Sequence, residues 1–267
     1  MTALQAIALG LVQGVTEFLP VSSSAHLILT SRLLGWTDQG LNFDMAANSG
    51  SLLAVLLYLR RDLAALGSGL WARLRGTPNG ESTAAIQVLL ASLPVAFGGL
   101  LLQGFVGADG RSLGVLGATS LVFGLLLAWA DRRVANSEEV RCWSWRQVTW
   151  VGLAQALAVI PGTSRSGVTM TAGLFSGMSR YDATRLSFLL AVPVGLMVAI
   201  KDVWDMAGES NTVHEPVALA LGTAAAAVSA YFAIDWLLSW VHKHGFVGFA
   251  VYRVLLGVVL LALAATG

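Results

Sequence analysis

Cysteine and charge are both scarce in this chain of 267 residues. The single cysteine, Cys142, excludes an internal disulfide and any metal site built from several cysteines. Charged residues make up 12% of the chain, whereas a soluble domain carries about 25%, so too few are present to coat a surface that faces water. With a net charge of +1 and no basic block, we expect no nucleic-acid partner. A basic segment is also missing ahead of the first apolar stretch, so we expect that stretch to belong to the mature fold and not to a cleaved signal peptide.

Hydrophobic residues, in contrast, make up 56% of the chain and are grouped into long runs. Runs of this length can cross about 30 Å of hydrocarbon at about 1.5 Å per residue. The sequence therefore predicts an all-α integral membrane protein embedded in a lipid bilayer. Six uninterrupted spans are expected, over residues 43–60, 84–104, 113–131, 183–201, 216–240 and 246–266.

Two further apolar regions, 3–34 and 147–177, are each interrupted by a polar segment that contains a proline. The first segment runs from Pro20 to His26 and the second from Pro161 to Gly167. Proline breaks a helix interior, and the pieces on either side are short for a full crossing. Each region is therefore expected to be a re-entrant hairpin of two short helices. Non-helical backbone at membrane depth is tolerated only where protein buries it or it lines a wet cavity.

The two hairpins are predicted to be internal repeats within a single membrane domain, 1–267. Pro20 and Pro161 are offset by 141 residues, and the run 52–55 (LLAV) recurs at 189–192, offset by 137. Repeat one covers about 1–135 and repeat two about 143–267, each with one hairpin and three spans. Because three spans are an odd number, the second repeat is inverted relative to the first, as in many transporters. Chance similarity among helices rich in leucine and alanine is the alternative.

The distribution of basic residues predicts the orientation. One side of the membrane receives eleven Lys and Arg residues and the other receives three, namely Arg32, Arg111 and Lys201. The eleven are Arg60, Arg61, Arg73, Arg75, Arg132, Arg133, Arg141, Arg146, Arg180, Arg185 and Lys243. The basic side is expected to be cytoplasmic, which places both termini outside and lets the two broken tips meet near the midplane.

The first polar segment and the helix before it carry a candidate catalytic group. Gln13 and Glu17 are four residues apart and share a helix face, and a carboxylate inside an apolar run indicates function. Three hydroxyls, those of Ser22, Ser23 and Ser24, open the helix that carries His26, where they can act as N-caps or face a phosphate. Either Ser22 or Ser23 could reach the imidazole, as in a nucleophile–base pair, or His26 could act as a general acid or base. The alternative is a serine cap beside a packed histidine.

The second polar segment is suited to a phosphate. Arg165 is flanked by hydroxyls and glycine at the start of a half-helix, and its planar fork can bind two oxygens. The predicted phosphate-binding hydroxyls are those of Thr163, Ser164 and Ser166, together with Ser22 and Ser24. Arg165 could instead be a structural counter-ion for Glu17.

Two other polar residues lie inside predicted spans. Arg253 is a weaker candidate for phosphate binding, because Asp235 in the adjacent span lies at similar depth and could pair with it. Asn48 could pack between helices or face the site.

The motifs QGVTEFLPVSSSAH (Gln13 to His26) and PGTSRSG (Pro161 to Gly167) resemble the two signatures of the undecaprenyl-pyrophosphate phosphatase family of the bacitracin-resistance type. Further matching segments are Gly50 to Leu63, Arg185 to Pro193 and Phe249 to Gly257. The resemblance implies an enzyme of the bacterial inner membrane that removes the terminal phosphate from undecaprenyl pyrophosphate. It further implies that the lipid carrier is recycled for cell-wall synthesis, that bacitracin resistance follows, and that the reaction takes place on the outer side with a divalent cation, Mg²⁺ or Ca²⁺.

By position, the resemblance assigns catalysis to Glu17, Ser23, His26 and Arg165, and the metal to Glu17 with Gln13. The chain departs from the family where Gln13 replaces a common glutamate, which removes a negative ligand, and where Ala25 and Asn48 replace a usual glycine and glutamine. Whether Ser23 attacks phosphorus or only positions it for water stays open. So does the oligomeric state, a homodimer included.

Two rival functions use the same features. A transporter or lipid flippase would explain inverted repeats with half-helices at the midplane, but has little use for a serine–histidine pair beside an arginine. A structural or bacitracin-sequestering membrane protein would need no catalytic residues.

Overall fold

The computed structural model describes residues 1–102, 112–134, 143–208 and 215–266, and within these ranges it is helical without strands. Some parts of the sequence used above lie outside the described residues, namely Arg111, Arg141, Cys142 and the end of the predicted span 84–104.

The first interrupted region forms two helices, α1 (Ala3–Phe18) and α2 (Ser23–Leu33), which pack against each other. Helix α1 begins with a capping box, in which Thr2 accepts a hydrogen bond from Gln5 N and its own N–H donates to the Gln5 side chain. The helix ends just ahead of Pro20, as expected. Ser22, the residue before α2, has φ +73°, a region that non-glycine residues seldom occupy.

The second interrupted region repeats this arrangement with α8 (Trp145–Gln155), a short 3₁₀ helix η2 (Ala156–Val159) and α9 (Arg165–Phe175). Ser164, the residue before α9, has φ +67°. The two breaks therefore share an unusual feature, a serine with positive φ directly ahead of the second helix. Backbone strain of this kind costs about 1–3 kcal/mol and persists where the surroundings hold it.

Five helical segments are long and apolar enough to cross a membrane, which fits a multi-pass membrane protein. They are Gly80–Gly99, spanning α5 (Gly80–Ala91) and most of α6 (Leu93–Leu102), then α7 (Leu113–Arg132), Arg180–Trp204 of α10 (Arg180–Gly208), α11 (Pro216–His244) and α12 (Val247–Thr266). These correspond to five of the six predicted spans. The remaining one, 43–60, forms helix α3 (Gly40–Tyr58) but is not among the five.

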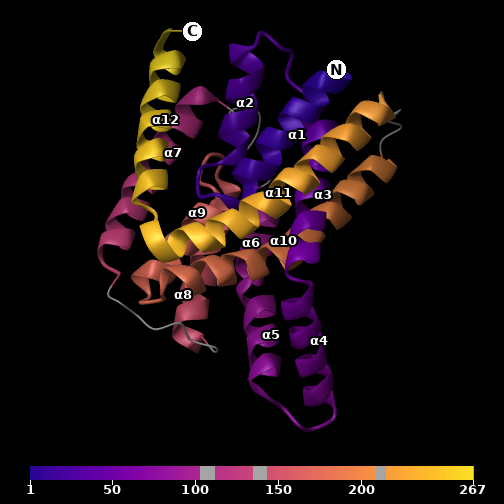
Figure 1. Ribbon diagram of the computed structural model, residues 1–267, viewed down its shortest axis with the longest axis vertical. Helices are drawn as coiled ribbons and strands as arrows, with labels where there is room; N and C mark the ends of the chain where they lie inside the picture. The colour runs from indigo at the N-terminus through magenta and orange to yellow at the C-terminus, as the bar shows by residue number, and fades with distance from the viewer. Residues whose placement is uncertain (103–111, 135–142, 209–214, 267) are drawn as a thin grey trace.

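One helix was not predicted. Residues Arg60–Leu74, read from the sequence as a connection, form α4, which pairs with α5. The two project together beyond the rest of the helices (Figure 1). Only Gly69 of α4 is buried, and the main packing partner of this helix is α5.

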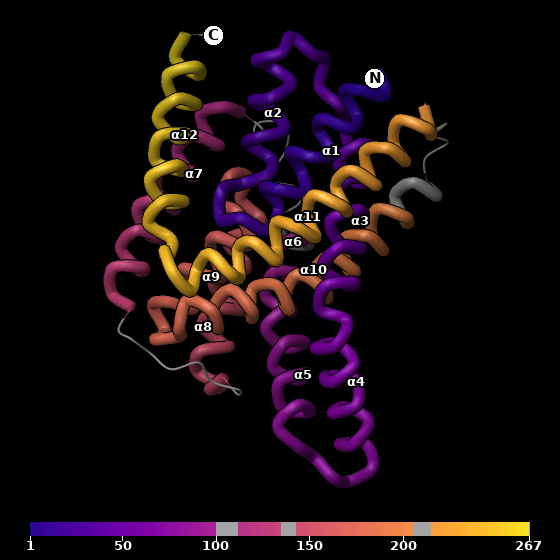
Figure 2. The backbone as a smooth tube through the Cα atoms, in the orientation of Figure 1, coloured from indigo at the N-terminus to yellow at the C-terminus, as the bar shows by residue number. Residues whose placement is uncertain are grey.

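Close helix contacts assemble the rest of the fold. Helix α1 packs on α11, α11 on α3, and α12 on α7. Both ends of the chain lie at the same end of the molecule, at the top of Figure 2, with α2 between them in this view. Small residues allow this approach: a Cβ added at Gly14 would clash with Ser229 and Ala226 of α11. Small residues at such interfaces are typical of membrane helix packing. The arrangement holds the breaks after α1 and before α9 in the interior.

Candidate active site

The two helix breaks lie against each other, although about 140 residues separate them in sequence. Ser166 at the start of α9 donates from Oγ to Leu19 O at 3.0 Å and lies 3.3 Å from Glu17 O. These carbonyls lie at the end of α1, where the helix itself supplies no donor, and Leu19 O also accepts from Val21 N at 2.8 Å. Ser166 thus fixes the second break against the first.

Arg253 of α12 connects the breaks a second time. Its Nη2 donates to Gly162 O and Thr163 O, both at 2.9 Å, and its Nη1 reaches Pro20 O at 3.5 Å. The side chain is fully buried. The alternative in which Asp235 pairs with Arg253 is wrong, because Asp235 accepts a hydrogen bond from Tyr58 Oη at 2.9 Å.

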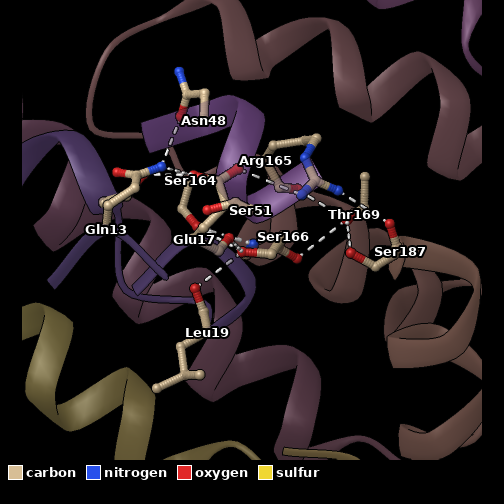
Figure 3. Close-up of polar contacts among 12 residues, drawn as sticks. Gln13, Glu17, Leu19, Asn48, Ser51, Ser164, Arg165, Ser166, Thr169 and Ser187 are labelled. Atoms are coloured by element: carbon tan, nitrogen blue, oxygen red, sulfur yellow. Dashed lines mark hydrogen bonds and ion pairs between the residues drawn. The ribbon is translucent and has the colours of Figure 1, made fainter. Parts of the chain in front are cut away.

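Glu17, in the last turn of α1, is the centre of the polar contacts (Figure 3). Its Oε2 accepts hydrogen bonds from Ser23 Oγ at 2.8 Å and Gln13 Nε2 at 3.1 Å. Its Oε1 lies 3.6 Å from Arg165 Nη2. A carboxylate, a hydroxyl and a guanidinium drawn from both breaks therefore converge, as the sequence predicts. The pairing of Arg165 with Glu17 is also present.

Arg165 is held by a second anchor. Its Nη1 donates to Ser187 O of α10 at 3.0 Å, and Thr169 Oγ1 donates to Ser187 Oγ at 2.7 Å. The guanidinium also lies 6.0 Å from the Phe18 ring centroid, within cation–π range. One guanidinium nitrogen is thus fixed to the scaffold while the other faces Glu17.

These groups line a pocket of about 700 Å³, a volume typical of ligand sites. Its polar residues beside the breaks are Glu17, Ser22, Ser23, Ser24, Asn48, Ser164 and Arg165. Apolar side chains form most of the remaining wall, among them Leu52, Val55, Val95, Val159, Val194, Met197 and Val198, and Lys201 and Asp202 of α10 also line it. The pocket thus combines an anion-binding group with an extended apolar surface.

Three predicted phosphate-binding residues do not line the pocket. Thr163, Ser166 and Arg253 are fully buried and are not among the residues that line the pocket. Two of these side chains, together with the Thr163 carbonyl, connect the breaks to each other. Contacts to a phosphate remain predictions for Ser22, Ser24 and Ser164, which do line the pocket.

His26 does not meet a serine hydroxyl as expected. Its Nδ1 lies 2.7 Å from the backbone oxygen of Ser22, and its Nε2 lies 2.6 Å from Tyr252 Oη of α12. The His26 and Tyr252 rings also stack, with centroids 5.5 Å apart and an interplanar angle of 17°. His26 is not among the pocket-lining residues. His26 lies four positions after Ser22 on the same face of α2, so its ring reaches the Ser22 carbonyl. The other side of the ring points toward α12.

Gln13 and Asn48 form one unit with Glu17. The Gln13 amide donates to Asn48 Oδ1 at 2.7 Å as well as to Glu17, so Asn48 faces the site. Within the described ranges, no group of three or more His, Cys, Asp or Glu residues could hold a metal ion. The oxygens of Glu17, Ser23 and Asn48 are nevertheless the hard donors that Mg²⁺ prefers, and Mg²⁺ often binds one carboxylate together with substrate phosphates. The residues present therefore fit a cation shared with a phosphate.

Sequence reasoning missed two contributors, Ser187 and Tyr252. Ser187 acts mainly through its backbone oxygen, which no side-chain pattern reports. Tyr252 directly precedes Arg253, which the sequence analysis named as a candidate for phosphate binding. That position next to a charged residue inside a span was the available indication that Tyr252 contributes to the site.

Comparison with known proteins identifies the family of the chain. Residues 6–259 match the family described as bacitracin resistance protein BacA. A protein of Magnetococcus marinus named undecaprenyl-diphosphatase is 48% identical over 268 residues, covering 98% of this chain and 99% of that protein. Both matches run through the two helix breaks and the pocket they form, and the chain belongs to the BacA family.

Proposed function

We propose that this protein is an undecaprenyl-diphosphatase, which hydrolyses undecaprenyl pyrophosphate to the monophosphate and phosphate. The reaction would return the lipid carrier to cell-wall synthesis and confer bacitracin resistance. Family membership and the relative's name support the reaction class. The observation that carries the proposal is the meeting of Glu17, Ser23 and Arg165, from two distant helix breaks, in one pocket with apolar walls.

The pocket suggests how the substrate lies. The pyrophosphate would occupy the polar end beside Arg165, whose fork suits phosphate oxygens. The polyprenyl chain would follow the apolar side chains of α3, α6 and α10, where burial of each CH₂ contributes about 0.8 kcal/mol.

Glu17 and Arg165 would have different roles in catalysis. Arg165 Nη2 would neutralise charge that develops on the phosphoryl oxygens in the transition state. Ser23 Oγ already donates to Glu17 Oε2 at 2.8 Å, so Glu17 is placed to accept the proton of the attacking oxygen. That oxygen is Ser23 Oγ or a water that Ser23 positions. A phosphoserine trapped at Ser23 would establish the first route.

A divalent cation, Mg²⁺ or Ca²⁺, would be held by Glu17 together with the pyrophosphate oxygens. When bound, it supplies positive charge that lowers the barrier to attack on phosphorus. Gln13 presents its NH₂ group to Glu17 in this structure, so its amide oxygen would become a ligand only after the amide rotates.

The membrane arrangement is part of the proposal. We propose that α3 completes six spans, that α1–α2 and α8–α9 are re-entrant hairpins, and that the two repeats are inverted. The matching serines of positive φ, Ser22 and Ser164, support the repeat. The enzyme would lie in the bacterial inner membrane with both termini and the pocket mouth outside, since the basic residues gather on the opposite side. Single cysteines placed in a Cys142→Ser background and labelled from outside would test this topology.

The activity is tested with purified protein, polyprenyl pyrophosphate and Mg²⁺ in detergent, with released phosphate as the readout. We expect Arg165→Ala and Glu17→Gln to lower kcat/KM by about a thousandfold, the scale of one lost transition-state contact. Arg132→Ala, at an exposed position at the end of α7, serves as the matched control. Lipid movement in liposomes without phosphate release would instead indicate a transporter, and bacitracin resistance unaffected by either site variant would indicate a sequestering protein.

A further inference from the structure

Both ring nitrogens of His26 are engaged, and this determines where its protons lie. The partner of Nδ1 is the Ser22 carbonyl oxygen at 2.7 Å, and a carbonyl can only accept. Nδ1 therefore carries a proton in either charge state of the ring. In the neutral ring, Nε2 must then accept from the Tyr252 hydroxyl at 2.6 Å. The Ser22 carbonyl thus selects the tautomer of the imidazole, and the phenol stabilises it by donating to Nε2.

The carbonyl that His26 holds belongs to the peptide between Ser22 and Ser23. This peptide is planar and trans, so its C=O and its N–H point in opposite directions. Holding the oxygen toward His26 directs the Ser23 N–H away from it. Ser22 and Ser23 line the pocket while His26 does not.

The backbone of α2 restrains this peptide only through a long hydrogen bond, from His26 N to Ser22 O at 3.4 Å, whereas the matching bond from Val168 N to Ser164 O is 2.9 Å, so a further restraint is needed. Ser22 has φ +73° and its side chain makes no capping hydrogen bond to α2, whereas the matching Ser164 accepts one from Gly167 N at 3.1 Å. The bond from His26 Nδ1 supplies the restraint at the break after α1. Ser23 follows directly and places its hydroxyl 2.8 Å from Glu17.

We propose that Tyr252 and His26 are positioning residues that orient the Ser22–Ser23 peptide for catalysis, and that His26 does not exchange protons with the substrate. By donating to Nε2, Tyr252 stabilises the tautomer in which Nδ1 donates. His26 Nδ1 in turn holds the peptide in its strained conformation, so that Ser23 Oγ faces Glu17. The proposal rests on the proposed phosphatase function, because Ser23 and Glu17 are the groups that it aligns.

Substitutions of His26 separate positioning from acid–base chemistry. The amide NH₂ of asparagine lies near the position of Nδ1, and that of glutamine near Nε2. We expect His26→Asn to keep a kcat within about tenfold of wild type, and His26→Gln and His26→Ala to lose about a hundredfold or more, the scale of a misplaced reacting group. An amide can replace the hydrogen bond from Nδ1 but cannot act as a general acid or base. If the kcat of His26→Asn is less than ten times that of His26→Ala, the positioning role is refuted.

Tyr252→Phe tests the other end of the contact. Phenylalanine keeps the ring stacking and removes only the hydroxyl. We expect kcat to fall about threefold to tenfold, the scale of one hydrogen bond, with KM within twofold of wild type. An unchanged kcat, or a change confined to KM, would contradict the proposal. Tyr231→Phe in α11, which contacts the Tyr58 ring, serves as the matched control and should leave kcat and KM unchanged.

A spectroscopic measurement makes the test independent of activity. In protein labelled with ¹⁵N-histidine, the His26 signal, assigned by its loss in His26→Asn, should show a protonated Nδ1 and, in the neutral ring, a bare Nε2. Tyr252→Phe removes the donor to Nε2 and should raise the share of the other tautomer, while the Ser22 carbonyl still favours a protonated Nδ1. A neutral His26 protonated at Nε2 in wild type would overturn the proposal. A wild-type protein that releases no phosphate would contradict the proposed function, and the ¹⁵N result would still decide whether Tyr252 fixes His26.

Discussion

Arg253→Met tests whether the connection between the two breaks holds the site together. Methionine fills a similar space and has no donor, so the substitution frees Gly162 O and Thr163 O, each 2.9 Å from Arg253 Nη2. The longer contact to Pro20 O, at 3.5 Å, is lost as well. All of these acceptors lie at the ends of broken helices, where the helix itself supplies no donor.

The expected cost follows from these bonds. A buried acceptor left without a donor costs about 1–3 kcal/mol, so two cost about 2–6 kcal/mol. Removal of a buried charge that has no carboxylate partner offsets part of this, because that charge is expensive to keep out of water. We expect a net loss of about 2–3 kcal/mol. For a chain of this size, about 2–4 °C is lost per kcal/mol, so the Tm should fall by roughly 4–12 °C.

Catalysis should respond as well. Without Arg253, the contacts described above between the two breaks reduce to the hydrogen bonds of the Ser166 hydroxyl and the contacts of Arg165 with Glu17 and Phe18. A shift of about 1 Å in such a geometry costs about a hundredfold in rate. We therefore expect kcat to fall by tenfold to a hundredfold at a temperature well below both melting points, with Arg253→Lys intermediate because its ammonium keeps the charge and reaches fewer of the three carbonyls.

The assay is thermal unfolding in detergent, followed by phosphate release from the same preparation. Arg132→Met removes an exposed arginine and should change stability by less than about 0.5 kcal/mol. A Tm for Arg253→Met that equals that of Arg132→Met would refute the reasoning, since it would show that the buried guanidinium does not secure the breaks.

Three further substitutions test other parts of the site. Arg165→Lys keeps the charge but loses the fork, so kcat/KM for lipid pyrophosphate should fall about ten- to a hundredfold, and an unchanged value would show that the fork is not used. Gln13→Glu adds a carboxylate beside Glu17 and should lower the Mg²⁺ concentration for half-maximal activity by about tenfold (~1.4 kcal/mol); an unchanged Mg²⁺ titration would place the cation elsewhere. Gly162→Ala places a Cβ on a residue with φ +83° and against the Thr119 side chain, whereas Gly177→Ala places one at φ +85° in open space. Gly162→Ala should therefore lower the Tm more than Gly177→Ala does. Equal losses of Tm would exclude the contact with Thr119 as the cause.

The meeting of the two breaks could be predicted, because polar and charged groups inside a membrane need partners. A proline ends a helix in the apolar phase, and a carboxylate and a guanidinium in that phase both need partners. Glu17 and Arg165 satisfy each other at 3.6 Å, so the prediction that they converge is confirmed. The length of the apolar runs likewise predicted five helical segments that are, among the described residues, long and apolar enough to cross a membrane.

The errors at Arg253 and His26 share one physical cause, which is that the sequence argument did not consider backbone hydrogen-bonding groups. A sequence argument pairs Arg253 with another charge, Asp235, but the helix breaks present free carbonyls close by, and the guanidinium binds those. The same holds for His26, whose Nδ1 meets the Ser22 carbonyl and no hydroxyl. The spacing of side chains along a helix says nothing about carbonyls that a break exposes.

Helix α4 was missed for a different reason. Its residues Arg60–Leu74 are too polar on average for a span, and the sequence offers no way to distinguish an amphipathic helix paired with α5 from a long loop. Pairing decides its structure, because an isolated helix of 15 residues is only marginally stable in water.

The contacts around Glu17 explain how the carboxylate and the Arg165 guanidinium can pair before a substrate arrives and how Arg165 can then leave that pair. Glu17 Oε2 has two donors, Ser23 and Gln13, and these remain when Arg165 turns away. Arg165 keeps its Nη1 bond to Ser187 O and gives up only a contact of 3.6 Å, which is longer than a direct hydrogen bond. A guanidinium cannot lose its proton, so in this setting it needs an anion, and a phosphate that offers two oxygens matches its fork better than one distant carboxylate oxygen does. The ion pair is therefore weak enough to be replaced by a pyrophosphate, while the bonds that orient each partner stay in place.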